Sequence, residues 1–189
     1  MNENGLVEVE NPSELFLAER RNDITGSTIF PSLEGTRPIL VEVQALVSNA
    51  NFGTPQRNVN GFDFKRLAML LAVLEKRIGT HMGTKDVFIN LVGGLKIDDP
   101  AADLAVISAV ASSSRDKLIK ESVVLIGEVG LGGEVRSVSR LKERINEAKS
   151  LGFKSVIAPA ANLKRMKDRI KGVDITGVTN VGEVFHHLF

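Results

Sequence analysis

Segments with strand character alternate with segments with helix character after residue 60, and this alternation constrains the fold more than any other feature. The strongest helix is predicted over 62–78, where leucines recur with a period close to 3.6 residues and charged residues keep to the other side. A nearly uncharged stretch over 100–114 predicts a second helix that is buried on most sides. Glycines over 127–138 predict a hairpin. This order of elements favours an α/β fold with a mixed sheet of the α+β type.

The remaining elements are predicted from the same periodicities and from helix-end signals. Asn11 can cap the first helix and Glu14 follows it by three residues, as in a capping box. Ser139 is the predicted cap of a later helix, and the Asn-, Gly- and Pro-rich segment 49–61 is predicted to be a loop. Predicted strands cover 38–49, 86–92, 123–126, 155–158 and 173–178, and predicted helices cover 12–21, 139–151, 160–170 and 181–188.

Size and composition indicate one globular domain over residues 1–189. The 189 residues are 43% hydrophobic and 25% charged, which suits a sizeable core and argues against disorder. The chain has no cysteine, which excludes thiol catalysis, thiolate zinc sites and disulfides and fits a cytoplasmic location. No apolar run approaches the roughly 20 residues that cross a bilayer, so no membrane partner is expected.

The charge is unevenly placed along the chain. The formal net charge is only +1, yet residues 1–14 hold four acids and no base. Residues 136–171 hold eleven bases and three acids. Such asymmetry makes a basic face and an anionic partner possible. The alternative is a set of ordinary solvated helix faces.

Motifs for cofactors or metals lack the required spacing. The segment 79–85 has one residue too few between its glycines for a phosphate loop, and it follows a helix instead of a strand. The glycines over 127–133 lack the dinucleotide-binding pattern. His186 and His187 are adjacent, so a helix would splay them by about 100°. The sequence therefore predicts no cofactor and no metal site in this domain.

Two longer segments carry a family resemblance: DVFINLVGGLKIDDPAAD and GEVGLGGEVRSVSRLKERINEAKSLGFKSVIAP. They resemble the proteolytic domain of Lon-type proteases, which has a nucleophilic serine in a G-P-S-A-G segment and a catalytic lysine in a G-L-K-E-K segment. Lys142 falls on the lysine, but Ala101 stands at the serine position. Because a methyl group cannot attack a carbonyl, no catalytic residue is predicted. The flanking Asp99 and Asp103 are expected to favour a charged Lys142.

Five ordered segments carry a closer resemblance: NPSELFLAER, GFDFKRLAMLLAVLEKR, DVFINLVGG, DPAADLA and GEVGLGGEVR. They are similar to the C-terminal part of the bacterial RadA (Sms) family of DNA-repair proteins, over nearly the whole chain. The resemblance implies a fold of the ribosomal-protein S5 domain-2 type, homo-hexameric rings, branch migration along DNA and a recombinase partner for the full-length protein. In that family a zinc finger and a RecA-like ATPase precede this domain, so ATP, Mg and Zn are expected only there. The chain is expected to correspond to the C-terminal domain alone.

Basic residues are the candidates for contacts with duplex or branched DNA. Arg57 lies before the long helix, and Lys65 and Arg66 lie in its first turns. By analogy with Lon-like rings, Lys142 should line the channel with Arg144 beside it. A ring repeats each charge six times, which favours sequence-independent binding to the duplex backbone. The nine phenylalanines suit the core better than base stacking.

Two alternatives stand beside this hypothesis. Under the first, the domain is a pure oligomerisation scaffold and all DNA contacts lie in the motor domain; buried or intersubunit bases would favour it. Under the second, the domain is a residual peptidase that uses another serine, such as Ser108.

Overall fold

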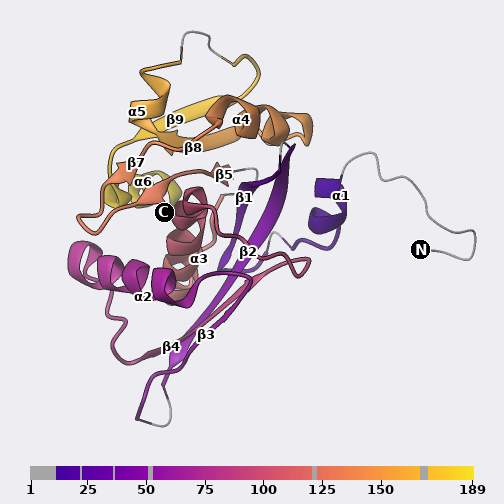
Figure 1. Ribbon diagram of the computed structural model, residues 1–189. Helices are drawn as coiled ribbons and strands as arrows, with labels where there is room; N and C mark the ends of the chain where they lie inside the picture. Colours follow the sequence, from indigo (N-terminus) through magenta and orange to yellow (C-terminus); the bar gives the residue numbers. More distant parts are fainter. Residues whose placement is uncertain (1–11, 22, 36, 51–52, 121–122, 167–169) are drawn as a thin grey trace, which may run out of the picture.

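A mixed sheet of seven strands frames the computed structural model, which describes residues 12–21, 23–35, 37–50, 53–120, 123–166 and 170–189 (Figure 1). The strand order is β3-β4-β2-β1-β5-β8-β9. The pairs β1–β2 and β2–β4 are antiparallel, whereas the other neighbours are parallel. The mixed α/β sheet predicted from the sequence is confirmed. The strands are β1 (Ser27–Glu34), β2 (Arg37–Asn49), β3 (Arg57–Asn60), β4 (Lys85–Leu91), β5 (Val123–Leu125), β8 (Ser155–Pro159) and β9 (Asp174–Val178).

Helices pack on both sides of the long strands. In Figure 1, α2 and α3 lie to the left of β1 and β2, and α1 lies to the right. The predicted glycine-rich hairpin is confirmed as the pair β6 (Glu128–Val129) and β7 (Val135–Arg136). The helices are α1 (Pro12–Leu17), α2 (Phe64–Val73), α3 (Asp103–Arg115), α4 (Leu141–Ser150), α5 (Ala160–Leu163) and α6 (Val181–Leu188), with a π turn η1 (Leu74–Ile78) and a 3-10 turn η2 (Pro100–Ala102).

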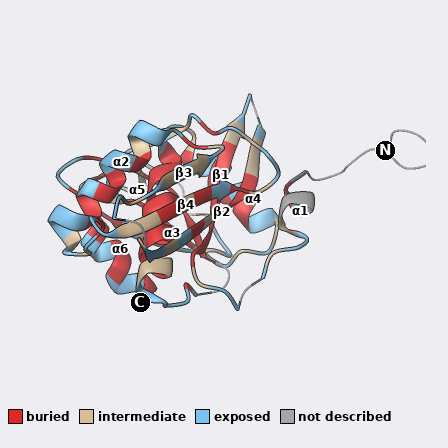
Figure 2. Ribbon diagram, turned by 90° about the horizontal axis from the view of Figure 1, so that it is seen from below, coloured by how far each residue is buried: buried red, intermediate tan, exposed pale blue. Residues whose placement is uncertain are grey.

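Helix α3 forms the centre of the core, as its lack of charge predicted. All residues from 103 to 112 are buried, and Figure 2 shows buried residues concentrated where helices face the sheet. Small side chains let this helix lie close to the strands. Its last turn is tied to them by two hydroxyls: Ser112 Oγ accepts from Gly26 N at 2.9 Å, and Ser113 Oγ accepts from Val47 N at 2.9 Å.

Strand β2 is covered on both faces in its first half. Leu40 and Glu42 are buried together with Val41 between them, so both sides of the strand are inside. Helix α1 covers the second face, because Ser13 Oγ accepts from Leu40 N at 3.0 Å and donates to Glu147 Oε1 of α4 at 2.9 Å. Beyond residue 43 more buried and more exposed residues of β2 alternate, as expected for a strand with one face toward solvent.

The two halves of the sheet meet between β1 and β5. One registered pair, Ile29 with Val124, joins these strands, whereas β1 and β2 pair over eight positions. Helix α3 packs against β1, β2 and β5 and therefore crosses this seam. The seam therefore combines a short strand ladder with contacts from the buried helix.

Strand β3 contradicts the predicted loop over 49–61. Residues 57–60 pair in parallel with β4, from Arg57 opposite Val87 to Asn60 opposite Asn90. The segment RNVN contains two asparagines, which are poor strand formers, so its local sequence gives no strand signal. The pairing is decided by the neighbouring strand and by Arg57, whose guanidinium bonds to backbone carbonyls of the adjoining segment.

Three helix ends differ from the prediction. Helix α1 ends at Leu17 and α5 at Leu163, earlier than predicted. Asn11, the predicted cap of α1, lies outside the described residues. Ser139 is not the cap of α4, because the N-cap is Arg140, with φ 54° and no capping hydrogen bond from its side chain. The carbonyl of Ser139 instead accepts from Arg144 Nε at 3.1 Å.

Candidate functional site

The turn η2 contains Ala101, the residue that the sequence resemblance places at the nucleophile position of Lon-type proteases. Asp99 caps this turn, since its Oδ1 accepts from Ala101 N at 3.0 Å. The carbonyl of Ala101 accepts from Gly127 N at 2.9 Å, and Gly127 O accepts from Leu104 N at 3.0 Å. The side chain of Ala101 is only 1% exposed. The turn is therefore locked between helix α3 and the segment before the β6–β7 hairpin.

An ion pair braces one side of this turn. Arg144 of α4 donates from Nη2 to Asp99 Oδ2 at 2.5 Å and from Nη1 to Pro31 O at 2.5 Å. Arg144 is completely buried. Loss of hydration lowers the pKa of its guanidinium, and the bond to Asp99 opposes that effect. Arg144 therefore ties α4, β1 and η2 together.

A second ion pair braces the other side. Arg66 of α2 forms a bidentate pair with Asp103, through Nε to Oδ1 and through Nη2 to Oδ2 at 2.5 Å. Val129 N also donates to Asp103 Oδ2 at 2.9 Å. Burial raises the pKa of the Asp103 carboxyl, because lost hydration outweighs these hydrogen bonds. The bond to Asp103 in turn raises the pKa of Arg66. This pair joins α2, α3 and the hairpin.

The expected pairing of the two aspartates with Lys142 is therefore corrected. Asp99 and Asp103 face Arg144 and Arg66, and these arginines supply the opposite charges that the buried carboxylates require. Lys142 lies on the exposed side of α4, two residues from the buried Arg144. Two residues on a helix are separated by about 200°, which explains why the two side chains point in different directions.

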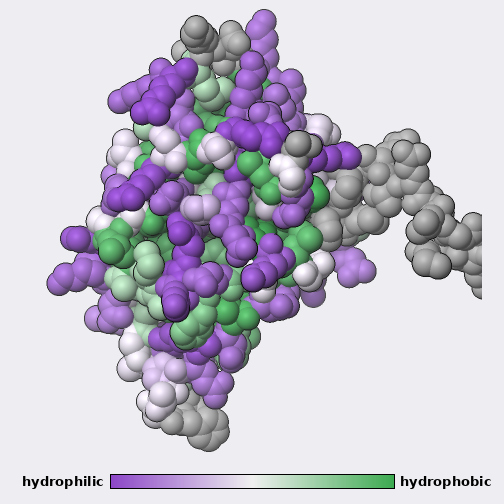
Figure 3. Space-filling model, in the orientation of Figure 1, coloured by the Kyte–Doolittle hydropathy of each residue, from purple (hydrophilic) through white to green (hydrophobic). Residues whose placement is uncertain are grey.

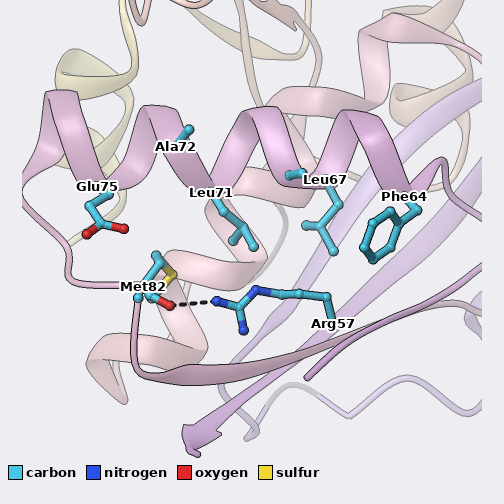
Figure 4. Close-up of a pocket in the computed structure, with 9 residues that line it drawn as sticks. Arg57, Phe64, Leu67, Leu71, Ala72, Glu75 and Met82 are labelled. Atoms are coloured by element: carbon cyan, nitrogen blue, oxygen red, sulfur yellow. Dashed lines mark hydrogen bonds between the residues drawn. The ribbon is translucent and has the colours of Figure 1, made fainter. Parts of the chain in front are cut away.

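Arg57 also turns inward. Its Nη2 donates to Met82 O at 2.6 Å, and its Nη1 donates to Gln56 O at 3.0 Å and to Lys85 O. The side chain lies beneath α2 and lines a cavity of about 250 Å³, where the bond to Met82 is visible in Figure 4. Its guanidinium holds the turn before β4 against β3.

The five predicted DNA-binding residues thus separate into three groups: buried, part-buried and exposed. The prediction is wrong for Arg144, because a buried side chain cannot touch a nucleic acid in this conformation. Arg57 and Arg66 are part-buried and hold backbone carbonyls and a buried carboxylate, respectively. Lys65 and Lys142 are exposed, and they do not share a helix. The five bases therefore do not form one exposed set.

The C-terminal third of the chain carries several exposed bases, of which the site prediction named only Lys142. Figure 3 shows hydrophilic side chains over the upper part of the molecule, where Figure 1 places α4, α5, β8 and β9. The signal was present in the sequence as the excess of bases over residues 136–171. The exposed bases there are Arg136, Lys142, Lys149, Lys154, Lys164, Arg165 and Lys171.

Other candidate chemistry is not supported within the described part of the chain. Ser108 is completely buried, and its Oγ has no hydrogen-bond partner, so neither a base nor a substrate reaches it. The described residues contain no cluster of three His, Asp or Glu side chains that would hold a metal ion. No helix among them is long and apolar enough to cross a membrane.

Comparison with known proteins agrees with this geometry. The C-terminal proteolytic domain of Lon protease (S16) matches residues 74–189, and this chain belongs to that family. The chain is 51% identical over 183 residues to the DNA repair protein RadA of Bacillus subtilis, covering 97% of this chain and 40% of that protein. It is 46% identical over 189 residues to the DNA repair protein RadA of Streptococcus pyogenes serotype M1, covering 100% of this chain and 42% of that protein.

These matches confirm the resemblance to a Lon-like domain of RadA that five sequence segments predicted. A third relative, the DNA repair protein RadA of Listeria monocytogenes, is 48% identical over 183 residues. The chain spans about 40% of the length of these relatives.

Proposed function

We propose that this chain is a proteolytically inactive Lon-like domain of a cytoplasmic DNA repair protein. The domain binds the phosphate backbone of duplex DNA and assembles into a hexameric ring. The observation that carries the proposal is the state of the nucleophile position. Ala101 is sealed inside the protein, between the Asp99–Arg144 and Asp103–Arg66 ion pairs.

The loss of proteolysis follows from the chemistry of that position. A serine–lysine dyad needs a hydroxyl that attacks the carbonyl and a lysine that accepts its proton. Ala101 has no hydroxyl, and its side chain is 1% exposed, so a substrate carbonyl could not approach it. Arg66 and Arg144 form ion pairs with Asp103 and Asp99, which flank Ala101 in the sequence. In Lon-type proteases this turn positions the nucleophile, whereas in this chain the turn η2 stabilises the fold.

Binding to duplex DNA is supported by the uneven charge. The bases over 136–171 are mostly exposed, whereas the acids in that range are few. Lys65 and Lys142 are the predicted contact residues that the structure leaves on the surface. Lysine–phosphate contacts release counterions and carry no sequence information, so the expected binding is sequence-independent and salt-sensitive.

The role in the whole protein is inferred from the relatives. They carry the name DNA repair protein RadA, and they are more than twice as long as this chain. In such a protein the ring would act beside a motor domain that uses ATP during branch migration, with a recombinase as partner. ATP, Mg and Zn would bind outside this domain.

A pure oligomerisation scaffold is the second candidate. It is favoured by the inward placement of Arg57, Arg66 and Arg144, which removes three of the five expected DNA contacts. Under this candidate every DNA contact lies in the motor domain, and the exposed lysines are ordinary solvated residues.

Fluorescence anisotropy with labelled duplex and single-stranded DNA separates the two candidates. We expect duplex binding that weakens steeply with salt and that falls at least tenfold in the Lys65→Ala/Lys142→Ala double variant. Lys96→Ala, another exposed lysine, serves as the matched control. Absence of binding at low salt, in a sample that forms rings by light scattering, would support the scaffold instead.

A further inference from the structure

An apolar groove runs along α2 and ends at the loop before β4. Leu67 and Leu71 form its floor with Met82, and Phe64 forms one wall with its side chain 51% exposed. Figure 4 shows Phe64, Leu67 and Leu71 pointing toward Arg57, with Glu75 at the far end. We call this feature the α2 groove. Its volume, about 250 Å³, is below the range of about 300–1,000 Å³ typical of small-molecule pockets, so it suits a single apolar side chain.

The tip of the β6–β7 hairpin presents such a side chain. Leu131 is 63% exposed, the highest value among the large hydrophobic residues that the structure describes. Gly130 and Gly132 flank it, so no neighbouring side chain covers it from within the tip. A single exposed leucine is common on protein surfaces and means little alone. The informative observation is the position of Leu131 relative to the α2 groove.

Leu131 and the α2 groove lie on opposite flanks of the same helix. The hairpin lies beside the side of the helix that carries Val73 and Arg77. Arg77 Nε donates to Leu131 O at 3.5 Å. Gly133 is so close to Val73 that a Cβ added to the glycine would lie 4.0 Å from Val73 Cγ1. Val73 is about 200° around the helix from Leu71 of the groove floor. Leu131 therefore cannot reach the groove of its own chain. It can reach the groove of a second copy placed beside the first.

The charges at the two sites are complementary. Arg77 lies beside Leu131, and Glu75 lies at the end of the α2 groove. Both side chains are exposed, and neither forms an ion pair with another described residue. An approaching copy that inserts Leu131 would carry its positive Arg77 toward the negative Glu75. Opposite charges on the two rims favour this orientation over its reverse.

We propose that Leu131 of one copy of this chain inserts into the α2 groove of the next copy. The contact uses different surfaces on the two partners, so it repeats head to tail and gives a ring where the rotation closes. This inference rests on the ring assembly in the proposed function and names the surfaces that build it. It does not depend on DNA binding.

Mixing two defective variants tests the contact directly. Leu131→Asp removes the inserted side chain, and Ala68→Arg blocks the groove from an exposed helical position. By sedimentation velocity we expect each variant alone to be monomeric under conditions where the unmodified chain forms larger species. An equimolar mixture retains one intact contact and should stop at a heterodimer. Leu118→Asp, at another exposed leucine, should assemble like the unmodified chain.

Charge exchange and cross-linking give two independent readouts. Glu75→Arg and Arg77→Glu should each weaken assembly, and the variant with both changes should recover it. The chain has no cysteine, so Leu131→Cys/Ala68→Cys should form an intermolecular disulfide ladder on oxidation. If Leu131→Asp still assembles and the double-cysteine variant forms no disulfide ladder, this contact is overturned but the proposed ring is retained. If the unmodified chain is monomeric and the double-cysteine variant forms no ladder, both the contact and the ring are overturned. Fluorescence anisotropy still measures DNA binding separately.

Discussion

Asp99 and Asp103 flank Ala101, and each binds an arginine from a distant part of the chain. The Asp99–Arg144 pair joins residues 45 apart in sequence, and the Asp103–Arg66 pair joins residues 37 apart. Removing one partner of a buried pair leaves an uncompensated charge, which costs more than the pair contributes. These four residues therefore set the stability of the turn around Ala101.

Asp99→Asn tests this point at the residue scale. The asparagine keeps an oxygen that can accept from Ala101 N, but Arg144 loses its counter-charge. We expect the free energy of unfolding to fall by about 3 kcal/mol, measured by urea denaturation. The double variant Asp99→Asn/Arg144→Met should recover much of this loss, because no buried charge remains. A loss that is equal in the single and double variants would contradict the proposed role of the pair.

Ala101→Ser tests the proposed loss of proteolysis. We expect no cleavage of a fluorogenic peptide, because the added hydroxyl is buried and no substrate can approach it. The buried hydroxyl should also lower the free energy of unfolding by about 1 kcal/mol. Cleavage that appears in Ala101→Ser and disappears when Lys142→Ala is added would show that the dyad geometry survives.

At this scale the sequence supported expectations for part of the site only. The family resemblance assigned motif positions to Ala101 and Lys142 from short segments. The ion pairs could not, because no local pattern links Asp99 to Arg144 or Asp103 to Arg66 across such separations. The analogy with Lon-like rings suggested a DNA contact for Arg144, whereas burial decides its role.

Among the elements, helix α3 ends in a conformation that favours glycine. Asp116 is its C-cap with φ 50°, and its N–H bonds to the carbonyls of Ser112 and Ser113. A Cβ in this left-handed region costs roughly 1 kcal/mol. We expect Asp116→Gly to unfold at a temperature equal to or above that of the unmodified chain. Asp116→Ala should be about 1 kcal/mol less stable than the glycine variant, measured by thermal denaturation.

Helix α6 depends on a capping box at its start. Thr179 N donates to Glu183 Oε2 at 2.7 Å, and Asn180 Oδ1 accepts from Glu183 N at 3.0 Å. Hydrogen bonds from the backbone and hydroxyl of Thr179 lower the pKa of Glu183. Because the folded-state pKa is lowered, ionised Glu183 stabilises the fold at pH values above its unfolded-state pKa of about 4.3. This stabilisation is lost as the pH falls through the folded-state pKa.

Glu183→Gln should therefore have a lower melting temperature than the unmodified chain at pH 7. The difference should shrink as the pH falls below about 4 and the carboxyl becomes protonated. Circular dichroism melts between pH 3 and 7 give the comparison. A difference that is constant over this range would show that the charge of Glu183 has no part in the cap.

Strong periodicity made most elements predictable. The amphipathic α2, the uncharged α3 and the alternating half of β2 each carry a signal within one segment. Strand β3 carries none, since its pairing with β4 is decided by tertiary context. The early end of α5 and the Arg140 cap of α4 also depend on local geometry that periodicity does not encode.

On the scale of the whole molecule, the proposed ring assembly and the proposed DNA binding would be coupled through charge. A ring repeats every exposed base, so the number of phosphates neutralised by one particle rises with the number of subunits. We expect the slope of log affinity against log salt to be several-fold smaller for Leu131→Asp than for the unmodified chain. Equal slopes, measured by anisotropy in samples of known mass, would show that each subunit binds DNA by itself.

The seam between β1 and β5 has a consequence for the order of folding. Strands β1 and β2 are neighbours in sequence and can pair early, whereas Ile29 must wait for Val124 to close a much longer loop. Strands β5, β8 and β9 are parallel neighbours that follow one another across the other half of the sheet. Helix α3 lies between the two halves in the chain, so we expect its burial to be the step that unites them. Destabilising changes within α3 should therefore slow refolding, whereas changes in β9 should chiefly speed unfolding.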